Sequence, residues 1–155
     1  MPVVPLDYIG LGKFRVKEAV SYRGVDVPEG FVTDLASIPR LFWPLLPANG
    51  WYELAAVFHD RLCVELAEGV CGLSSREVDR LFRVMARENA IDNPIGAWIV
   101  SWILWTGVRW GALLNPSRRD GWWRDGWLAL AITAILLLMS IVAVRRLDSL
   151  VHAVF

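Results

Sequence analysis

The feature that most constrains the fold of this chain is an uncharged apolar run near its C-terminal end. Residues 127–144, WLALAITAILLLMSIVAV, are 18 residues without a charged side chain. As a helix they would extend roughly 27 Å, close to the ~30 Å hydrocarbon core of a bilayer. Arg124 and Asp125 precede the run, and Arg145 and Arg146 follow it. We therefore predict a transmembrane helix; the alternative is an unusually apolar core helix.

The rest of the chain is predicted to form one soluble domain that this helix anchors. A length of 155 residues suits a single domain. We assign residues 1–115 to the domain, 116–126 to a basic aromatic linker, 127–144 to the transmembrane helix and 145–155 to a short tail. The first ten residues have neither the basic start nor the apolar run of a secretory signal.

Charge bears on topology and on partners. Three arginines at 118, 119 and 124 precede the apolar run and two follow it, so the positive-inside rule places the N-terminal domain in the cytoplasm by a margin of one charge. The net charge is zero and lysines number only two, which is unlike a nucleic-acid-binding surface. The predicted partner is the lipid bilayer, with no nucleic acid.

The domain is predicted to be α+β and mostly α, beginning with a β-hairpin. Residues 14–22 partly alternate between apolar and polar side chains, Arg23-Gly24 is a turn signal, and residues 25–27 resume an extended pattern. These features favour an N-terminal β-hairpin.

Three helices are expected after the hairpin. Residues 51–67 repeat apolar side chains at helical spacing, and a second apolar face runs from Val78 to Asn89 after a Ser74 and Glu77 capping box. A short turn between them makes the two helices antiparallel. The tryptophan-rich segment 95–114 is predicted to be a third helix that closes the core, or alternatively a second transmembrane helix.

The two cysteines, Cys63 and Cys71, are predicted to be free buried thiols. Their separation would also allow a disulfide across a helix end. They do not make a zinc site, because the sequence supplies no further pair of suitable ligands beside them.

The candidate chemistry lies in the dipeptide His59-Asp60, together with Asp34 upstream and Asp79 downstream. An imidazole is a good general base near neutral pH, and a carboxylate on its far nitrogen would fix the tautomer. The helix pairing could place Asp79 in that position. No serine or cysteine is placed convincingly as a nucleophile, so direct activation of water is the simplest mechanism. Asp34 and Asp60 are hard oxygen ligands suited to Ca²⁺ or Mg²⁺.

Two segments resemble the active-site helices of secreted phospholipase A2, especially its small bacterial forms. They are residues 53–60, ELAAVFHD, and residues 78–85, VDRLFRVM. The resemblance implies a calcium-dependent lipid-ester hydrolase acting on phospholipid. It would make His59 the water-activating base and Asp79 its supporting carboxylate. Asp60, Asp34 and the Leu35 carbonyl would be the calcium ligands.

A second resemblance covers residues 25–110 and is carried by the segment 28–40, PEGFVTDLASIPR, followed by the His-Asp helix and the later aspartate. These features are similar to an uncharacterised family of small phage and prophage proteins. The resemblance implies a phage origin and phage protein partners, and it supplies no activity.

Two functions from different classes follow. The first is a membrane-anchored phage or prophage protein that hydrolyses lipid esters with calcium. The second is a non-catalytic structural or lysis-associated membrane protein, in which His59, Asp60 and Asp79 form a buried polar network. A cleft that reaches His59 would favour the enzyme. The cytoplasmic orientation counts against it, since calcium is scarce there.

Overall fold

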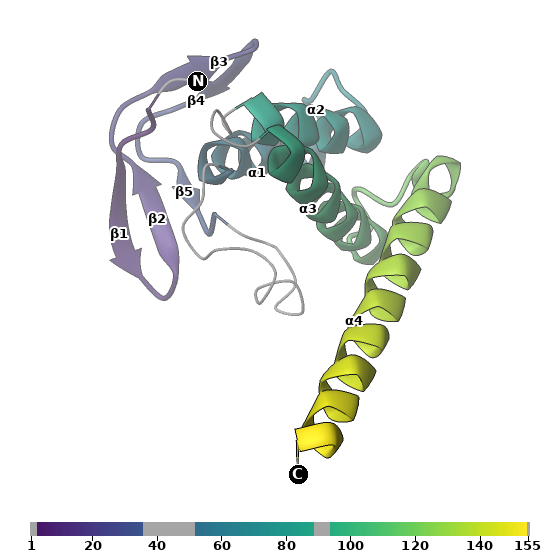
Figure 1. Ribbon diagram of the computed structural model, residues 1–155. Coiled ribbons are helices and arrows are strands. Elements are labelled where there is room, and N and C mark those ends of the chain that lie inside the picture. The colour runs from purple at the N-terminus through teal and green to yellow at the C-terminus, as the bar shows by residue number, and fades with distance from the viewer. Residues whose placement is uncertain (1–2, 36–51, 89–93, 155) are drawn as a thin grey trace.

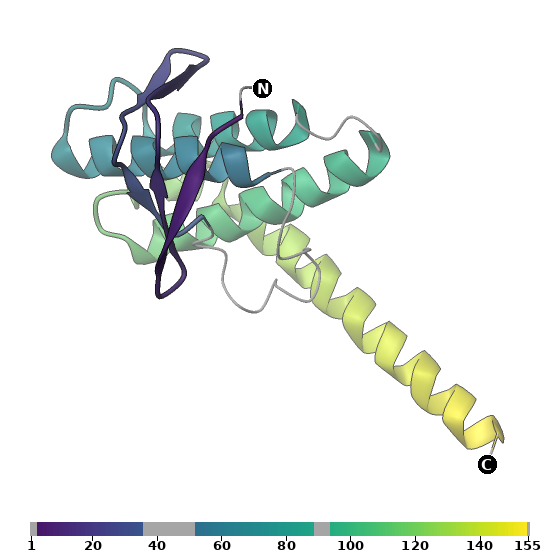
Figure 2. The same cartoon turned by 90° about the vertical axis from the view of Figure 1, so that its left-hand side faces the viewer.

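The computed structural model describes residues 3–35, 52–88 and 94–154. Small antiparallel sheets at the N-terminal end lie against a group of helices, and a long C-terminal helix projects away from them (Figures 1 and 2). The predicted class, a mostly helical α+β fold with a long apolar C-terminal helix, is confirmed.

The N-terminal strands form two sheets rather than one hairpin. Strands β1 (Leu6–Gly10), β2 (Lys13–Val16) and β5 (Val32–Thr33) pair in the order β1-β2-β5, while β3 (Val20–Tyr22) and β4 (Val25–Val27) form a separate two-stranded sheet. The β3–β4 pair is the predicted hairpin.

The turn of that hairpin follows from its two central residues. Arg23 and Gly24 both have positive φ, at 51° and 77°, as the tight turns favoured in hairpins require. The partly alternating pattern of residues 14–22 is divided between β2 and β3, because β2 ends at Val16. There the Val16 amide donates to the Phe31 carbonyl and the Lys17 amide donates to the Pro5 carbonyl, at 2.9 Å each. The chain then leaves the first sheet.

The two antiparallel helices begin and end close to the predicted residues. Helix α1 is Glu53–Glu68 and ends at Gly69, whose φ of 74° lets its amide cap the helix. Helix α2 is Ser75–Glu88. The Ser74 amide donates to Glu77 Oε2 at 2.8 Å and the Glu77 amide donates to Ser74 Oγ at 3.4 Å, so the capping box is confirmed.

Helix α3 (Pro94–Leu114) packs along α2, and together with α1 these helices enclose the core. The sheets lie on one side of these helices (Figure 1), and apolar side chains of the strands belong to the same core. Its largest fully buried apolar members are Val16, Val27, Val57, Phe58, Val78, Met85 and Leu104.

Helix α4 (Gly126–Val154) contains the apolar run that the sequence marks as a membrane span. Its segment Gly126–Arg146 is long and apolar enough to cross a bilayer, and only 6% of an 18-residue apolar stretch within it is buried. Helix α3 passes the same test of length and composition, but 56% of its 18-residue stretch is buried, as in a core helix. The tail expected at 145–155 continues the helix as far as Val154.

The segment expected to be a linker packs onto the helical body. Arg118, Trp122 and Asp125 are buried, and Trp122 Nε1 donates to the Arg109 carbonyl at 2.7 Å. A Cβ at Gly126 would lie 2.4 Å from the Trp122 ring, so only glycine permits this close approach. Residues 116–126 therefore fix where α4 starts relative to α3.

Candidate functional site

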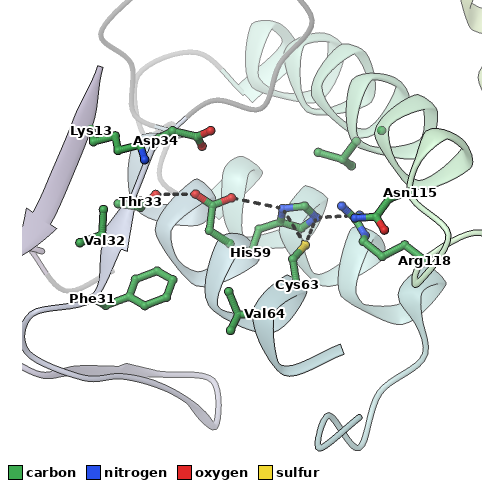
Figure 3. Close-up of a pocket in the computed structure, with 13 residues that line it drawn as sticks. Lys13, Phe31, Val32, Thr33, Asp34, His59, Cys63, Val64, Asn115 and Arg118 are labelled. Carbon is green, nitrogen blue, oxygen red and sulfur yellow. Dashed lines mark hydrogen bonds and ion pairs between the residues drawn. The ribbon is translucent and has the colours of Figure 1, made fainter. Parts of the chain in front are cut away.

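A cavity of about 350 Å³ opens between the first sheet, α1 and the C-terminal end of α3 (Figure 3). We call it the His59 cavity. The part of its wall that carries polar chemistry comes from Lys13, Thr33, Asp34, His59, Asp60, Cys63, Asn115 and Arg118. The cavity thus brings together polar residues from four separate parts of the sequence.

The predicted contact between the two helices is confirmed. His59 Nε2 lies 2.8 Å from Asp79 Oδ1. His59 is 5% exposed and Asp79 is wholly buried, so the pair is shielded from solvent on the α2 side. The Phe82 ring, with its centroid 4.8 Å from that of the imidazole, packs against the histidine from α2. The carboxylate accepts the hydrogen bond, and Nε2 therefore carries the proton.

The other ring nitrogen of His59 is the one available for chemistry. Nδ1 lies 4.0 Å from Asp60 Oδ1, too far for a hydrogen bond. The Cys63 sulfur is 3.7 Å from both ring nitrogens. A thiol in line with one nitrogen would be nearer to that nitrogen than to the other, so this contact does not have the geometry of proton transfer. The arrangement suits a water on Nδ1 better than a cysteine nucleophile.

The charge state of His59 is set by opposing effects. Burial lowers the pKa of the imidazole, whereas the hydrogen bond to Asp79 and the neighbouring Cys63 sulfur raise it, and the net result is a pKa of about 9. The histidine is then mostly protonated at neutral pH. Its base form becomes the major species only above pH 9.

Asp79 also binds two arginines that sequence analysis did not find. Arg109 Nη1 donates to Asp79 Oδ2 at 2.9 Å, and Arg118 Nη2 donates to Asp79 Oδ1. Arg109 is wholly buried and Arg118 is 7% exposed. A usable signal did exist: Arg109 is the only charge in the apolar α3, and a buried charge needs a partner.

The ion pairs continue away from the cavity. Arg109 Nη2 lies 3.0 Å from Asp125 Oδ1, an ion pair without hydrogen-bond geometry, and Arg76 Nε donates to Asp125 Oδ2 at 2.8 Å. Asp79 and Asp125 therefore bracket Arg109. We call the series His59, Asp79, Arg109, Asp125 and Arg76 the ion-pair chain.

Of the predicted calcium ligands, Asp34 and Asp60 line the cavity, and Leu35 is not among its lining residues. The Thr33 hydroxyl donates to Asp60 Oδ2, and the Leu35 amide donates to Thr33 Oγ1 at 3.0 Å. Leu35 is held at a φ of 57°, an uncommon conformation for leucine. Burial and the nearby Asp34 charge raise the pKa of Asp60, while Thr33 and His59 oppose that shift.

Asp34 and Asp60 thus line one cavity, and one oxygen of Asp60 is already bound by Thr33. Among the described residues, no group of three or more His, Cys, Asp or Glu side chains is arranged to hold a metal ion. The rest of the TDLASIPR segment, residues 36–40, lies outside the described residues. Cys63 and Cys71 are both free thiols here, and both are partly buried.

The fold and site define a small α+β protein with a His-Asp pair beside a cavity and a candidate membrane span. The chain belongs to the DUF1353 family, described as a protein of unknown function, whose sequence model matches residues 11–108. No curated protein and no solved structure matches the chain. The match covers β2 to β5, α1, α2 and most of α3, and it ends just before Arg109. The phage origin and the phospholipase resemblance stay predictions.

Proposed function

We propose that this protein is a membrane-anchored hydrolase in which His59 activates water toward a lipid ester. The observation that carries the proposal is the placing of His59. Asp79 holds its Nε2 at 2.8 Å, while the same imidazole lines a cavity of about 350 Å³. A base that is oriented on one side and open to a cavity on the other meets the geometric requirement of general base catalysis.

The proposed reaction uses His59 twice. Nδ1 removes a proton from water as the water oxygen attacks the ester carbonyl carbon. Asp79 stabilises the imidazolium that forms. Collapse of the tetrahedral intermediate breaks the bond between the carbonyl carbon and the alcohol oxygen, and Nδ1 returns its proton to the departing alcohol. Since the pKa of His59 is about 9, the rate should rise with pH as far as that value.

Calcium binding is a separable part of the proposal. Asp34, Asp60 and the Leu35 carbonyl would hold the ion, and the buried, raised-pKa carboxyl of Asp60 is a group that a cation would keep ionised. A bound calcium would polarise the ester carbonyl. Three oxygen donors are few for an ion that takes six to eight, so water and substrate would complete the set.

The test is ester hydrolysis by the full chain in a mild detergent, with phosphatidylcholine and phosphatidylglycerol as substrates and with millimolar calcium or a chelator. We expect turnover that His59→Gln abolishes and Cys63→Ala retains. Equal turnover in His59→Gln would remove the histidine from its role. Loss of turnover in Cys63→Ala, with the fold intact, would make the thiol the nucleophile instead.

Calcium is tested by thermal melting, without reference to turnover. Millimolar calcium should raise the melting midpoint of the wild type by mass action and leave that of Asp60→Asn unmoved. An unmoved wild-type midpoint, or equal shifts in both proteins, would contradict the calcium site. The proposed hydrolase would then have to work without calcium, as a protein with its N-terminal domain in the cytoplasm would need to.

A second candidate function is favoured by the ion-pair chain itself. His59, Asp79 and Arg109 come from α1, α2 and α3, and Arg118 and Asp125 come from the segment before α4. Such a network would fix the position of the candidate membrane span relative to the domain, as a structural or lysis-associated phage protein with phage protein partners would need. Undetectable hydrolysis of every ester, together with loss of stability in His59→Gln, would favour this function.

A further inference from the structure

A second site lies on the side of α2 that faces α3 and α4. Four arginines recur on α2 at positions 76, 80, 83 and 87, a spacing of four, three and four residues that puts them on one helix face. Three of them line a cavity of about 170 Å³. We call this the arginine cleft and define it by its lining residues Arg76, Arg80, Arg83, Trp105, Asp125 and Leu128.

The positive charge of the arginine cleft is not balanced within it. Asp125 is its single carboxylate, and that carboxylate is already shared by Arg76 and Arg109. Among the described residues neither Arg80 nor Arg83 has an ion-pair partner. The two guanidinium groups thus share one small cavity with no anion of their own.

The Arg83 side chain is held in place by stacking, but its buried Nε lacks a hydrogen-bond partner among the described residues. Its guanidinium carbon lies 3.9 Å from the centroid of the Trp102 ring, so the group stacks on the ring face. Its Nε is buried and makes no hydrogen bond among the described residues. Burial, and after it the neighbouring Arg80 and Arg87 charges, lower the pKa of Arg83, because nearby like charges disfavour the charged form. An anion in the cleft would satisfy the leftover donor and relieve that repulsion.

The position of the cleft indicates where such an anion would come from. Leu128 lies in the first turn of α4, at the start of the candidate span Gly126–Arg146, which projects from the helical body (Figure 2). Trp123, just before that turn, is 77% exposed, and Trp127, within it, is 64% exposed. Exposed tryptophans at the end of an apolar helix mark the depth of the lipid headgroups. The arginine cleft is therefore at headgroup depth if α4 spans a bilayer.

We propose that the arginine cleft binds the phosphate group of an anionic phospholipid. Arg80 and Arg83 supply N–H donors in the planar arrangement that suits phosphate oxygens. Trp105 and Leu128 supply apolar contact for the glycerol and the upper acyl chains. The site is distinct from the His59 cavity, and the proposal requires no hydrolysis.

The test is the melting midpoint of the full chain in a neutral detergent, titrated with phosphatidylglycerol, phosphatidylcholine or inorganic phosphate. Phosphatidylglycerol should raise the midpoint in a saturable way, because a ligand of the folded state stabilises it by mass action. Arg80→Gln should weaken the apparent affinity about tenfold, since one charge-assisted hydrogen bond is lost. The Arg80→Gln Arg83→Gln double variant should lose the response.

The matched control is Arg15→Gln, which removes the same charge from an exposed position on β2 and should respond as the wild type does. Arg80 is also exposed, so its single variant tests the site even where the double variant fails to fold. An equal response to phosphatidylcholine would overturn recognition of net negative charge. An equal response to inorganic phosphate would overturn the lipid as the source, and an unchanged response in Arg80→Gln would overturn the cleft as the site.

Discussion

The His59 cavity and the arginine cleft lie at opposite ends of the ion-pair chain, and they differ in how their charges are balanced. At the cavity end, the Asp79 carboxylate is bound by His59, Arg109 and Arg118, all of them buried. At the cleft end, Arg80 and Arg83 have no carboxylate among the described residues. Oppositely charged groups that pair with one another fix the local geometry. Groups of one sign without partners favour the binding of an external ligand of the opposite charge.

The contrast separates two kinds of function within one small fold. The His59 cavity is suited to chemistry, because its central side chain is oriented by a buried partner. The arginine cleft is suited to binding, because its charge remains to be matched. Asp125 belongs to both regions, since it pairs with Arg109 on one side and with Arg76 on the other. The predictions below test whether this division holds.

The largest effect is expected from Asp79→Asn. An amide would leave the buried Arg109 and Arg118 guanidinium groups without their carboxylate, and breaking a buried ion pair in this way costs about 3–5 kcal/mol of unfolding free energy. Denaturant unfolding of the full chain in detergent measures it. The matched control is Asp120→Asn, an exposed aspartate near the same segment, which should change stability by less than about 0.5 kcal/mol. Similar losses of unfolding free energy in both variants would mean that the charges of Arg109 and Arg118 are not balanced by Asp79.

The next effect is a loss of stability at alkaline pH. The pKa of His59 is about 9 in the folded protein, above the ordinary value of 6.5, so the protonated histidine stabilises the fold. This contribution is fully present below pH 6.5 and is lost as the pH rises from 6.5 through 9, and its size is roughly 3 kcal/mol. His59→Gln should remove this part of the pH dependence. A wild type whose stability falls no more steeply than that of His59→Gln over this range would contradict the raised pKa.

A smaller effect is expected where the two regions meet. Asp125→Asn weakens one of the two ion pairs of the buried Arg109, while its ion pair with Asp79 remains. We therefore expect a loss of roughly 2 kcal/mol of unfolding free energy. Arg80→Gln, in contrast, removes a charge that only repels its neighbours and should leave stability within about 0.5 kcal/mol of the wild type. A loss in Arg80→Gln as large as that in Asp125→Asn would show that Arg80 is already balanced, and the division between the regions would fail.

Sequence reasoning was most successful where the signal is local. The β3–β4 turn, the ends of α1 and α2 and the Ser74 capping box depend on residues a few positions apart. The contact between His59 and Asp79 was also predictable, because a short turn between two helices leaves few ways to pair them. The membrane-span prediction depends only on the length and composition of residues 127–144.

The remaining features depend on contacts distant in the sequence. Strand β1 pairs with β2, and β2 with β5, and neither pairing has a marked sequence pattern beyond short apolar runs. Arg118 and Asp125 lie in a segment whose composition resembles a polar linker, although their partners are on α2 and α3. The arginine spacing on α2 was visible, but that it lines a cleft depends on where α3 and α4 pack.

The smallest predicted effect asks whether the two regions are energetically linked. His59 and Asp125 do not touch, but Asp79 and Arg109 connect them. Residues in one ion-pair network show coupling energies of about 0.5–3 kcal/mol, and we expect the lower end of that range, since two residues intervene. The measurement is a double-mutant cycle of His59→Gln and Asp125→Asn by denaturant unfolding. The control cycle pairs His59→Gln with Asp120→Asn and should be additive within about 0.5 kcal/mol.

If both cycles are additive, the two ends of the ion-pair chain are not energetically coupled, and a ligand in the arginine cleft would leave His59 unaffected. If only the first shows coupling, a phospholipid that draws Arg76 away from Asp125 would also change the electrostatic surroundings of the proposed base.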